Sequence, residues 1–115
     1  MSKDAATLEK AHAIFDPIVA RFLGRPDVDI GPMFGSEGLR VRSKIFALVS
    51  FEGHLMLKLP AARTVELVHA GDAERVEMAG RSMREWVFVP VEKLSLWEPL
   101  MTEAFAYLDE ITPAG

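Results

Sequence analysis

Residues 28–59 are rich in β-branched and aromatic residues and are divided by Gly and Pro, a pattern that leaves few folds open to the chain. Short apolar segments bounded by such residues are typical of β-strands joined by turns. Glu52 and Gly53 predict a two-residue hairpin turn, because glycine adopts the positive φ that this turn requires. We expect an antiparallel meander with strands at about residues 29–34, 38–41, 44–51 and 54–59.

Helical periodicity flanks this stretch on both sides. Apolar residues three and four positions apart predict a first helix that begins near Asp4, with Leu8, Ala11, Phe15, Ile18 and Phe22 on one face. Pro17 lacks the N–H that a helix interior uses, so the helix either kinks there or restarts with Asp16 as its cap. A second helix is predicted over residues 61–70, with Val65 and Val68 facing the core, followed by strands at about residues 75–77 and 83–89.

Ser95 and Glu98 have the spacing of a capping box, so a last helix is predicted to begin here. Its inward face is expected to carry Trp97, Met101, Ala104, Leu108 and Ile111. The order of helix, three or four strands, helix, one or two strands and helix predicts an α+β fold. We expect one domain over residues 1–115, with an antiparallel sheet of about five strands and helices mainly on one face.

Composition excludes several kinds of functional site. The chain has no cysteine, which excludes disulfides, thiolate metal sites and a cysteine nucleophile. His12, His54 and His69 lie on separate predicted elements without ligand spacing, so we expect neither a metal site nor a cofactor. No serine has the context of a nucleophile, so no catalytic residue is assigned and the balance favours a non-enzymatic protein. Glu85 is expected in an ion pair at a strand edge, with a proton-transferring buried acid as the alternative.

The expected location is the cytoplasm. The first residues lack the basic and then apolar pattern of a secretory signal. The longest apolar run, residues 45–49, is far shorter than the ~20 residues that span a bilayer, so no membrane partner is expected. The net charge of −4 argues against general nucleic-acid binding. Residues 38–63 are nevertheless basic, and the segment from residue 92 onward is acidic.

A set of motifs in this order resembles the N-terminal domain of the TfoX competence-regulator family. The motifs are Met33-Phe34-Gly35, Gly38-Leu39-Arg40-Val41, Lys44-Ile45-Phe46-Ala47, Leu57-Lys58-Leu59-Pro60, Gly71 and Met83-Arg84-Glu85-Trp86. The resemblance covers about residues 8–108 and implies an α+β fold similar to the type III secretion chaperones, in proteins associated with regulation of DNA uptake. Ser43 stands where the resemblance implies a turn glycine, which is tolerable if the turn is not a tight primed one.

Strand alternation predicts two different sheet faces. One is apolar and is expected to be covered by the helices: Ile45, Ala47, Val49, Leu55, Leu57 and Leu59. The other, the mixed face, is expected to carry Lys44, Phe46, Leu48, His54, Met56, Lys58, Arg84, Trp86 and Phe88. Cations among aromatic and Met side chains suit a carboxylate, a nucleotide or an acidic protein segment. The alternative is that a terminal helix covers the apolar groups while the cations extend to water.

The leading interpretation is a non-enzymatic protein-interaction or regulatory module that binds a protein partner or forms a homodimer. Its candidate contacts on the mixed face are Lys44, Phe46, Met56, Lys58, Arg84, Trp86 and Phe88. A second interpretation is nucleic-acid binding through Arg40, Arg42, Lys44 and Lys58. A third is small-anion binding or an unrecognised enzyme, with the loop around Gly35 and Gly38 as an anion site or, alternatively, an ordinary hairpin connection.

Overall fold

The computed structural model describes residues 2–33 and 36–113. Within these residues, six strands form one antiparallel sheet in the order β1-β2-β3-β4-β6-β5. The strands are β1 (Val28–Met33), β2 (Ser36–Val41), β3 (Lys44–Val49), β4 (Leu55–Lys58), β5 (Glu74–Met78) and β6 (Arg81–Val89). The helices are α1 (Ser2–Phe22), α2 (Ala61–His69) and α3 (Trp97–Ile111), the last preceded by the 3-10 helix η1 (Val91–Leu96). The predicted α+β class and the three helix positions are confirmed.

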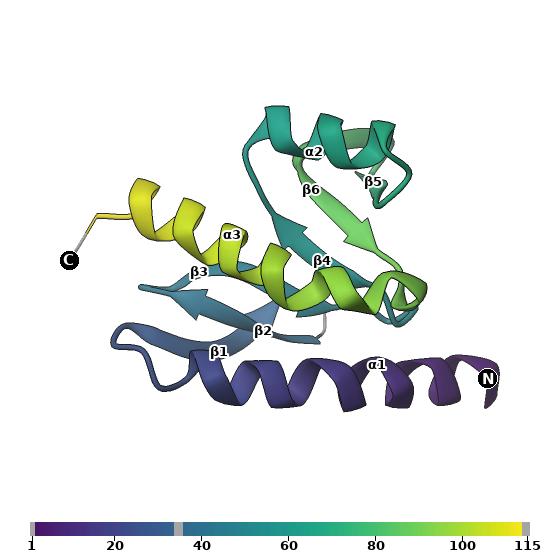
Figure 1. Ribbon diagram of the computed structural model, residues 1–115, viewed down its shortest axis with the longest axis horizontal. Coiled ribbons are helices and arrows are strands. Elements are labelled where there is room, and N and C mark those ends of the chain that lie inside the picture. The colour runs from purple at the N-terminus through teal and green to yellow at the C-terminus, as the bar shows by residue number, and fades with distance from the viewer. Residues whose placement is uncertain (1, 34–35, 114–115) are drawn as a thin grey trace.

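The three described helices contribute to one core on the same face of the sheet (Figure 1). Phe15 from α1 and Met101 from α3 pack in this helix-side core together with Leu57 of β4. α2 lies at the end of the sheet formed by β5 and β6, where Leu67 joins the same core. Because apolar side chains on that face are removed from water together, this core is the main source of the fold's stability.

A β-bulge in β3 changes the predicted faces of the sheet. β3 pairs with β2 through Ala47 and Leu39 and then through Ile45 and Arg40, which leaves Phe46 as the extra residue. A bulge of this kind shifts the alternation of side chains by one position. Phe46 and Ile45 therefore lie on the faces opposite to those that strict alternation assigns, whereas residues 47–49 keep their predicted faces.

Phe46 lies on the helix side, so its predicted place on the mixed face is wrong. Its ring is fully buried, at centroid distances of 5.6 Å from Phe22 and 5.6 Å from Phe105. Ile45 moves in the opposite direction, from the predicted helix side to the other face, where it packs beside Leu48. The other predicted helix-side residues are in the expected core: Ala47, Val49, Leu55, Leu57 and Leu59.

The face opposite the helices carries a second, smaller cluster. Its buried members are Leu48, Met56, Val76 and Trp86, flanked by the partly buried Ile45, Met78, Met83 and Phe88. The described helices all pack on the other face, so none of them covers this small cluster. The prediction that a terminal helix seals the mixed face is therefore wrong for the described part of the chain, although the centre of that face is buried.

Two connections between strands differ from their predictions: the turn from β2 to β3 and the connection from β3 to β4. Arg42 and Ser43 have φ values of 47° and 76°, so the connection from β2 to β3 is a tight two-residue turn of the primed kind. The β3–β4 connection is longer than predicted: Gly53 donates its N–H to Ser50 O, and Ser50 donates its N–H to His54 O. Gly53 still supplies a positive φ, of 83°, at the end of this loop.

The structure rejects one of the two alternatives for α1 and corrects one prediction for α2. α1 continues through Pro17, so it neither ends nor restarts at Asp16. In α2, Thr64 and Leu67 face inward, whereas Val65 is exposed. Thr64 is buried because its hydroxyl donates to the carbonyls of Ala61 and Arg84, which satisfies its polar group.

The predicted capping box at the last helix does not form. Leu96 is the N-cap of α3, and η1 runs directly into the helix, so Ser95 lies before the helix start. Glu98 binds Arg21 of α1 instead, through two hydrogen bonds of 2.8 and 2.6 Å. This pair lowers the pKa of Glu98, because the guanidinium stabilises the charged carboxylate. Ile111, which was predicted to lie on the inward face of α3, is 50% exposed.

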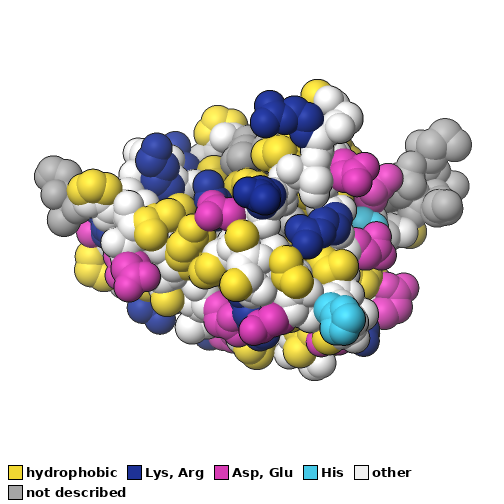
Figure 2. Space-filling model, turned by 90° about the horizontal axis from the view of Figure 1, so that it is seen from above, with side chains coloured by type: hydrophobic (Ala, Val, Ile, Leu, Met, Phe, Trp, Pro, Cys, Tyr) yellow, Lys and Arg dark blue, Asp and Glu magenta, His cyan; other side chains and the backbone are white. Residues whose placement is uncertain are grey.

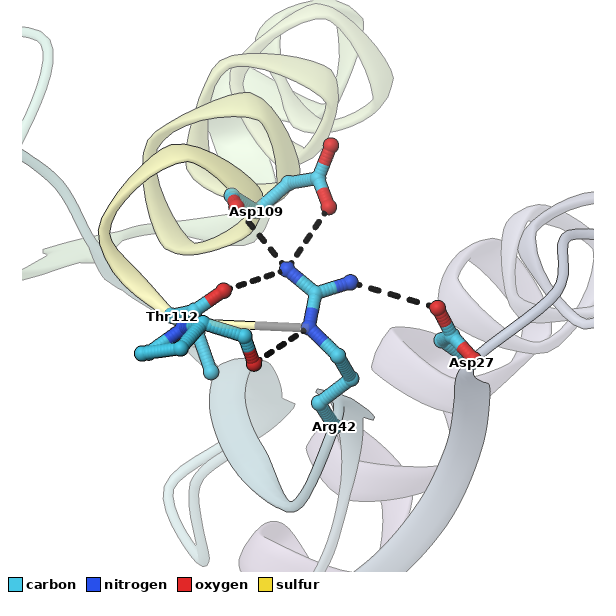
Figure 3. Close-up of polar contacts among 5 residues, drawn as sticks. Asp27, Arg42, Asp109 and Thr112 are labelled. Atoms are coloured by element: carbon cyan, nitrogen blue, oxygen red, sulfur yellow. Dashed lines mark hydrogen bonds and ion pairs between the residues drawn. The ribbon is translucent and has the colours of Figure 1, made fainter. Parts of the chain in front are cut away.

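Arg42 links three segments that are distant in the sequence (Figure 3). Its guanidinium donates to the carbonyls of Asp109, Thr112 and Pro113 at 2.8, 2.6 and 3.1 Å, at the C-terminal end of α3. It also forms ion pairs with Asp109 at 3.0 Å and with Asp27 at 3.3 Å. A cation is favourable at this end of a helix because the last carbonyls there have no helical partner.

Candidate functional site

A groove lined by cations lies where β6 extends past the end of β4. Lys58, the last residue of β4, pairs with Trp86, and β6 begins five residues before that position, at Arg81. The first turn of α2 forms the other side of the groove. We call this feature the cationic groove; its lining includes Lys58, Ala61, Arg81, Met83, Arg84 and Trp86.

A shallow hollow continues from the cationic groove along α2. It is lined by Ala61, Ala62 and the exposed Val65 of α2, and by the guanidinium-bearing side chains of Arg75 and Arg84. Figure 2 views the molecule from above, and the face seen there carries Lys and Arg side chains interspersed with hydrophobic ones. The surface therefore offers positive charge and small apolar contacts side by side.

The arginines of this surface, unlike most other arginines of the chain, form no ion pair with an acidic side chain among the described residues. The side chains of Arg75, Arg81 and Arg84 form no hydrogen bond or ion pair within the described residues. Elsewhere arginines are paired: Arg21 with Glu98, Arg40 with Asp29, Arg42 with Asp27 and Asp109, and Arg63 with Glu66 and Glu103. Positive charge without an internal counter-charge is available to an anion from outside.

Lys58 belongs to a chain of contacts at the rim of the groove. Its Nζ lies 3.7 Å from Glu85 Oε1 and 5.9 Å from the centre of the Trp86 ring. Tyr107 of α3 donates a hydrogen bond of 2.6 Å to Glu85 Oε2. That bond, strengthened by burial and by the charge of Glu85, raises the pKa of Tyr107 to about 12. The ion pair of Glu85 agrees with the prediction for this residue.

The structure brings together only part of the predicted partner-binding set. Lys58, Arg84 and Trp86 line the cationic groove, and Lys44 lies in a neighbouring hollow that also includes Lys58 and Trp86. Trp86 is only 6% exposed, so it contributes the edge of a buried ring to the surface. Lys58, Lys44 and Arg84 thus supply accessible charge.

The apolar members of the predicted set are less accessible. Met56 is buried in the small cluster and Phe88 is partly buried beside it, with its ring 5.7 Å from His54. Phe46 lies on the other side of the sheet and is shielded from any partner that docks on the mixed face. Apolar contact with a partner would therefore come from Ala61, Val65 and the partly buried Met83 rather than from these rings.

Three of the four cations predicted to contact nucleic acid form ion pairs within the chain. Arg40 donates two hydrogen bonds to Asp29, of 2.8 and 2.7 Å. Arg42 is held by the contacts at the end of α3 described above. Lys58 is paired with Glu85, and both Lys44 and Lys58 border the hollow beside Trp86.

The predicted anion loop is described only in part. Gly35 lies outside the described residues. Gly38 lies within β2, paired with Leu48, and a Cβ added there would meet Ala47 O at 3.0 Å and the side chains of Ile45 and Leu48 at 3.2 Å. Gly38 is therefore required for close packing between strands, whatever the neighbouring loop does.

Arg75, Arg81 and Tyr107 belong to this surface but were not among the predicted site residues. Arg81 lies before the predicted strand at residues 83–89, because the apolar pattern of β6 becomes regular only from Met83. Tyr107 lies in α3, four residues before its last residue, Ile111. Its partner Glu85 is 22 residues away in the sequence, so no local pattern connects them. In β5 the polar Arg75 is followed by the apolar Val76, and this alternation of polar and apolar residues was the one local sign that Arg75 lies on a strand.

The groove can hold anionic groups. Arginine donates paired hydrogen bonds to a carboxylate, and such charge-assisted bonds are stronger than neutral ones. Among the described residues, no group of three or more His, Asp or Glu side chains is arranged to hold a metal ion. None of the described helices combines the length and apolar character that crossing a bilayer requires.

Comparison of the chain with models of known protein families, with curated proteins and with solved structures finds no match. The resemblance to the TfoX N-terminal domain therefore rests on the quoted motifs alone. The groove and its charges provide the basis for a functional proposal.

Proposed function

We propose that this chain is a non-enzymatic, cytoplasmic interaction module that binds an acidic segment of a protein partner in the cationic groove. The observation that carries the proposal is the set of arginines without internal counter-charge, Arg75, Arg81 and Arg84, around a groove that also contains Lys58 and Trp86. A regulatory role, as the TfoX resemblance implies, is part of the same proposal.

Charge and shape favour a peptide over a nucleic acid. Ala61, Ala62 and Val65 offer shallow apolar contacts next to the arginines, which suits acidic residues alternating with small apolar ones. Single-stranded nucleic acids are held largely by stacking of bases on exposed aromatic rings. Trp86, the aromatic residue of the groove, is only 6% exposed and packs in the small cluster, so little of its ring is open to a base.

Nucleic-acid binding is the second candidate, because the same unpaired arginines would contact phosphates. It requires binding that weakens steeply as salt rises and that is shared by unrelated sequences. Retention of the protein on single-stranded or duplex DNA at low salt, lost at physiological salt, would favour this candidate over the peptide.

The test compares a fluorescently labelled peptide of alternating Glu and Val with a Lys and Val peptide of the same length, by anisotropy. Arg81→Ala combined with Arg84→Ala should weaken binding of the acidic peptide by at least about tenfold, because two charge-assisted contacts are lost. A matched control is Lys10→Ala with Arg21→Ala, which removes the same charge from α1, remote from the groove in Figure 1. Equal affinity of the two double variants would reject the proposal.

A further inference from the structure

β6 is longer than the strands that flank it, and this leaves part of it without a partner. β6 spans nine residues, whereas β4 spans four and β5 spans five. Pairing with β4 begins at Trp86 and continues to Val89. Pairing with β5 involves Arg81, Ser82, Val87 and Phe88. Met83, Arg84 and Glu85 therefore pair with neither strand.

Nearby groups occupy two carbonyls of this unpaired segment. Thr64 donates its hydroxyl to Arg84 O at 2.8 Å, and Leu59 donates its N–H to Glu85 O at 2.8 Å. After Leu59 the chain turns at Pro60 into α2, so the line of β4 ends there. Proline has no N–H and cannot continue a ladder of hydrogen bonds. The sheet thus has a gap next to Met83, at the place where a longer β4 would lie.

The cationic groove coincides with this gap. The unpaired residues of β6 line one side of the groove. Ala61, whose side chain is a single methyl group, lines the other side. The charges of Arg81 and Arg84 stand on the strand itself, and Lys58 stands at the end of β4. An extended chain that entered the gap would have main-chain groups of β6 beside it and cations along its length.

We propose that the partner segment binds in an extended conformation and adds to the sheet as a short strand beside Met83 of β6, in line with β4 beyond Leu59. This inference rests on the proposed function and specifies how the acidic segment is held. Main-chain hydrogen bonds in such strand addition supply affinity that tolerates changes of sequence, and side-chain contacts supply selectivity. Here Arg81, Arg84 and Lys58 select for acidic side chains.

The test uses main-chain methylation, which removes N–H donors without changing the charge of the peptide. The acidic Glu and Val peptide is made unmodified and in two forms, N-methylated at all odd or at all even positions. Only one edge of an added strand faces β6, because successive N–H groups of a strand point in opposite directions. One methylated form should therefore lose at least about tenfold in affinity, while the other should keep most of it.

Hydrogen exchange provides a second measurement on the unmodified protein. The unmodified peptide should slow amide exchange at residues 82–84, around the gap at Met83, and the inactive methylated form should not. A variant with Ala61→Trp, an exposed position at the start of α2, should exclude the peptide by filling the groove.

The outcomes separate the two proposals. Equal affinity of the three peptides, all of them sensitive to Arg81→Ala with Arg84→Ala, would overturn strand addition and leave the acidic-segment proposal in place. Failure of every acidic peptide to bind would overturn both. If the arginines only protect an exposed strand edge from association, their removal will promote aggregation and no peptide will bind.

Discussion

The hydroxyl of Tyr107 donates a 2.6 Å hydrogen bond to Glu85 and so joins α3 to β6 at the rim of the cationic groove. The bond connects the helix layer with the strand that carries the proposed binding surface. It also gives the chain a titratable group whose protonation is tied to the folded state, because the bond requires a protonated phenol and a charged carboxylate.

Tyr107 should make the folded state sensitive to alkaline pH. Its pKa is raised from 10.0 to about 12 in the folded state, so the protonated phenol stabilises the fold fully below pH 10, and this stabilisation is lost as the pH rises towards 12. The free energy of unfolding, measured with urea over this range, should fall more steeply for the parent protein than for Tyr107→Phe. Identical slopes would show that Tyr107 does not titrate differently on unfolding.

Glu85→Gln should lower the pKa of Tyr107 from about 12 back towards 10.0, since the hydrogen bond to Glu85 is the main cause of the shift. Tyr107 is the sole tyrosine, so ultraviolet absorbance of the phenolate reports its titration directly. Glu110→Gln is the control, because this exposed acid lies on the same helix without contacting the phenol. An unchanged titration in Glu85→Gln would contradict the bond.

Glu85→Gln should also strengthen binding of an acidic peptide in the groove. Glu85 partly neutralises Lys58 and repels incoming carboxylates, and removing one like charge at this range is worth ~0.5–1 kcal/mol. The expected gain in affinity is about two- to fivefold at moderate salt. Anisotropy titrations at two salt concentrations measure it, and weaker binding by the variant would indicate that Glu85 itself contacts the peptide.

Arg42→Ala should destabilise the protein by about 2–4 kcal/mol, because it leaves carbonyls at the end of α3 and two carboxylates without their donor. Arg42→Lys should recover only part of this loss, since an ammonium cannot contact all three carbonyls in the same geometry. Urea denaturation measures both. Arg40→Ala is the control: its pair with Asp29 is exposed, so its loss should matter much less.

Ser43→Gly should stabilise the protein by roughly 0.5 kcal/mol. Ser43 has a φ of 76°, a conformation that costs an L-residue energy and glycine almost none, although glycine loses more entropy on folding. Ser82→Gly, at an exposed position of β6, is the matched control and should be destabilising, because glycine weakens a strand. Thermal unfolding of the two variants should therefore shift in opposite directions.

Much of the fold follows from local patterns, and the main error in the strands has one local cause. Short apolar segments locate the strands of residues 28–59, and helical spacing locates α1 and α3. Gly31, Pro32 and Gly38 lie inside β1 and β2 and not between strands, and the turn from β2 to β3 consists of Arg42 and Ser43. Strict alternation fails at Phe46, because a bulge depends on how β2 pairs with β3 and not on β3 alone. Residues 45–49 of β3 are all apolar, so the sequence around the bulge gives no sign of the shift.

The candidate site was harder to predict because distant segments form it. The capping box fails since Glu98 binds Arg21, 77 residues away, in preference to its neighbour Ser95. Lys58, Arg84 and Trp86 could be assigned to one face from alternation, and the groove does contain them. The unmatched length of β6, and the lack of an ion pair at Arg81 among the described residues, become visible only when the strands are placed beside one another.

The two tryptophans stand on opposite sides of the sheet, Trp86 in the small cluster and Trp97 in the helix-side core. Each indole therefore reports by its fluorescence on a different layer of the molecule. With Trp97→Phe the remaining emission follows the groove side alone, and with Trp86→Phe it follows the helices alone. Loosening of one layer ahead of the other during denaturation would appear as two separate spectral transitions.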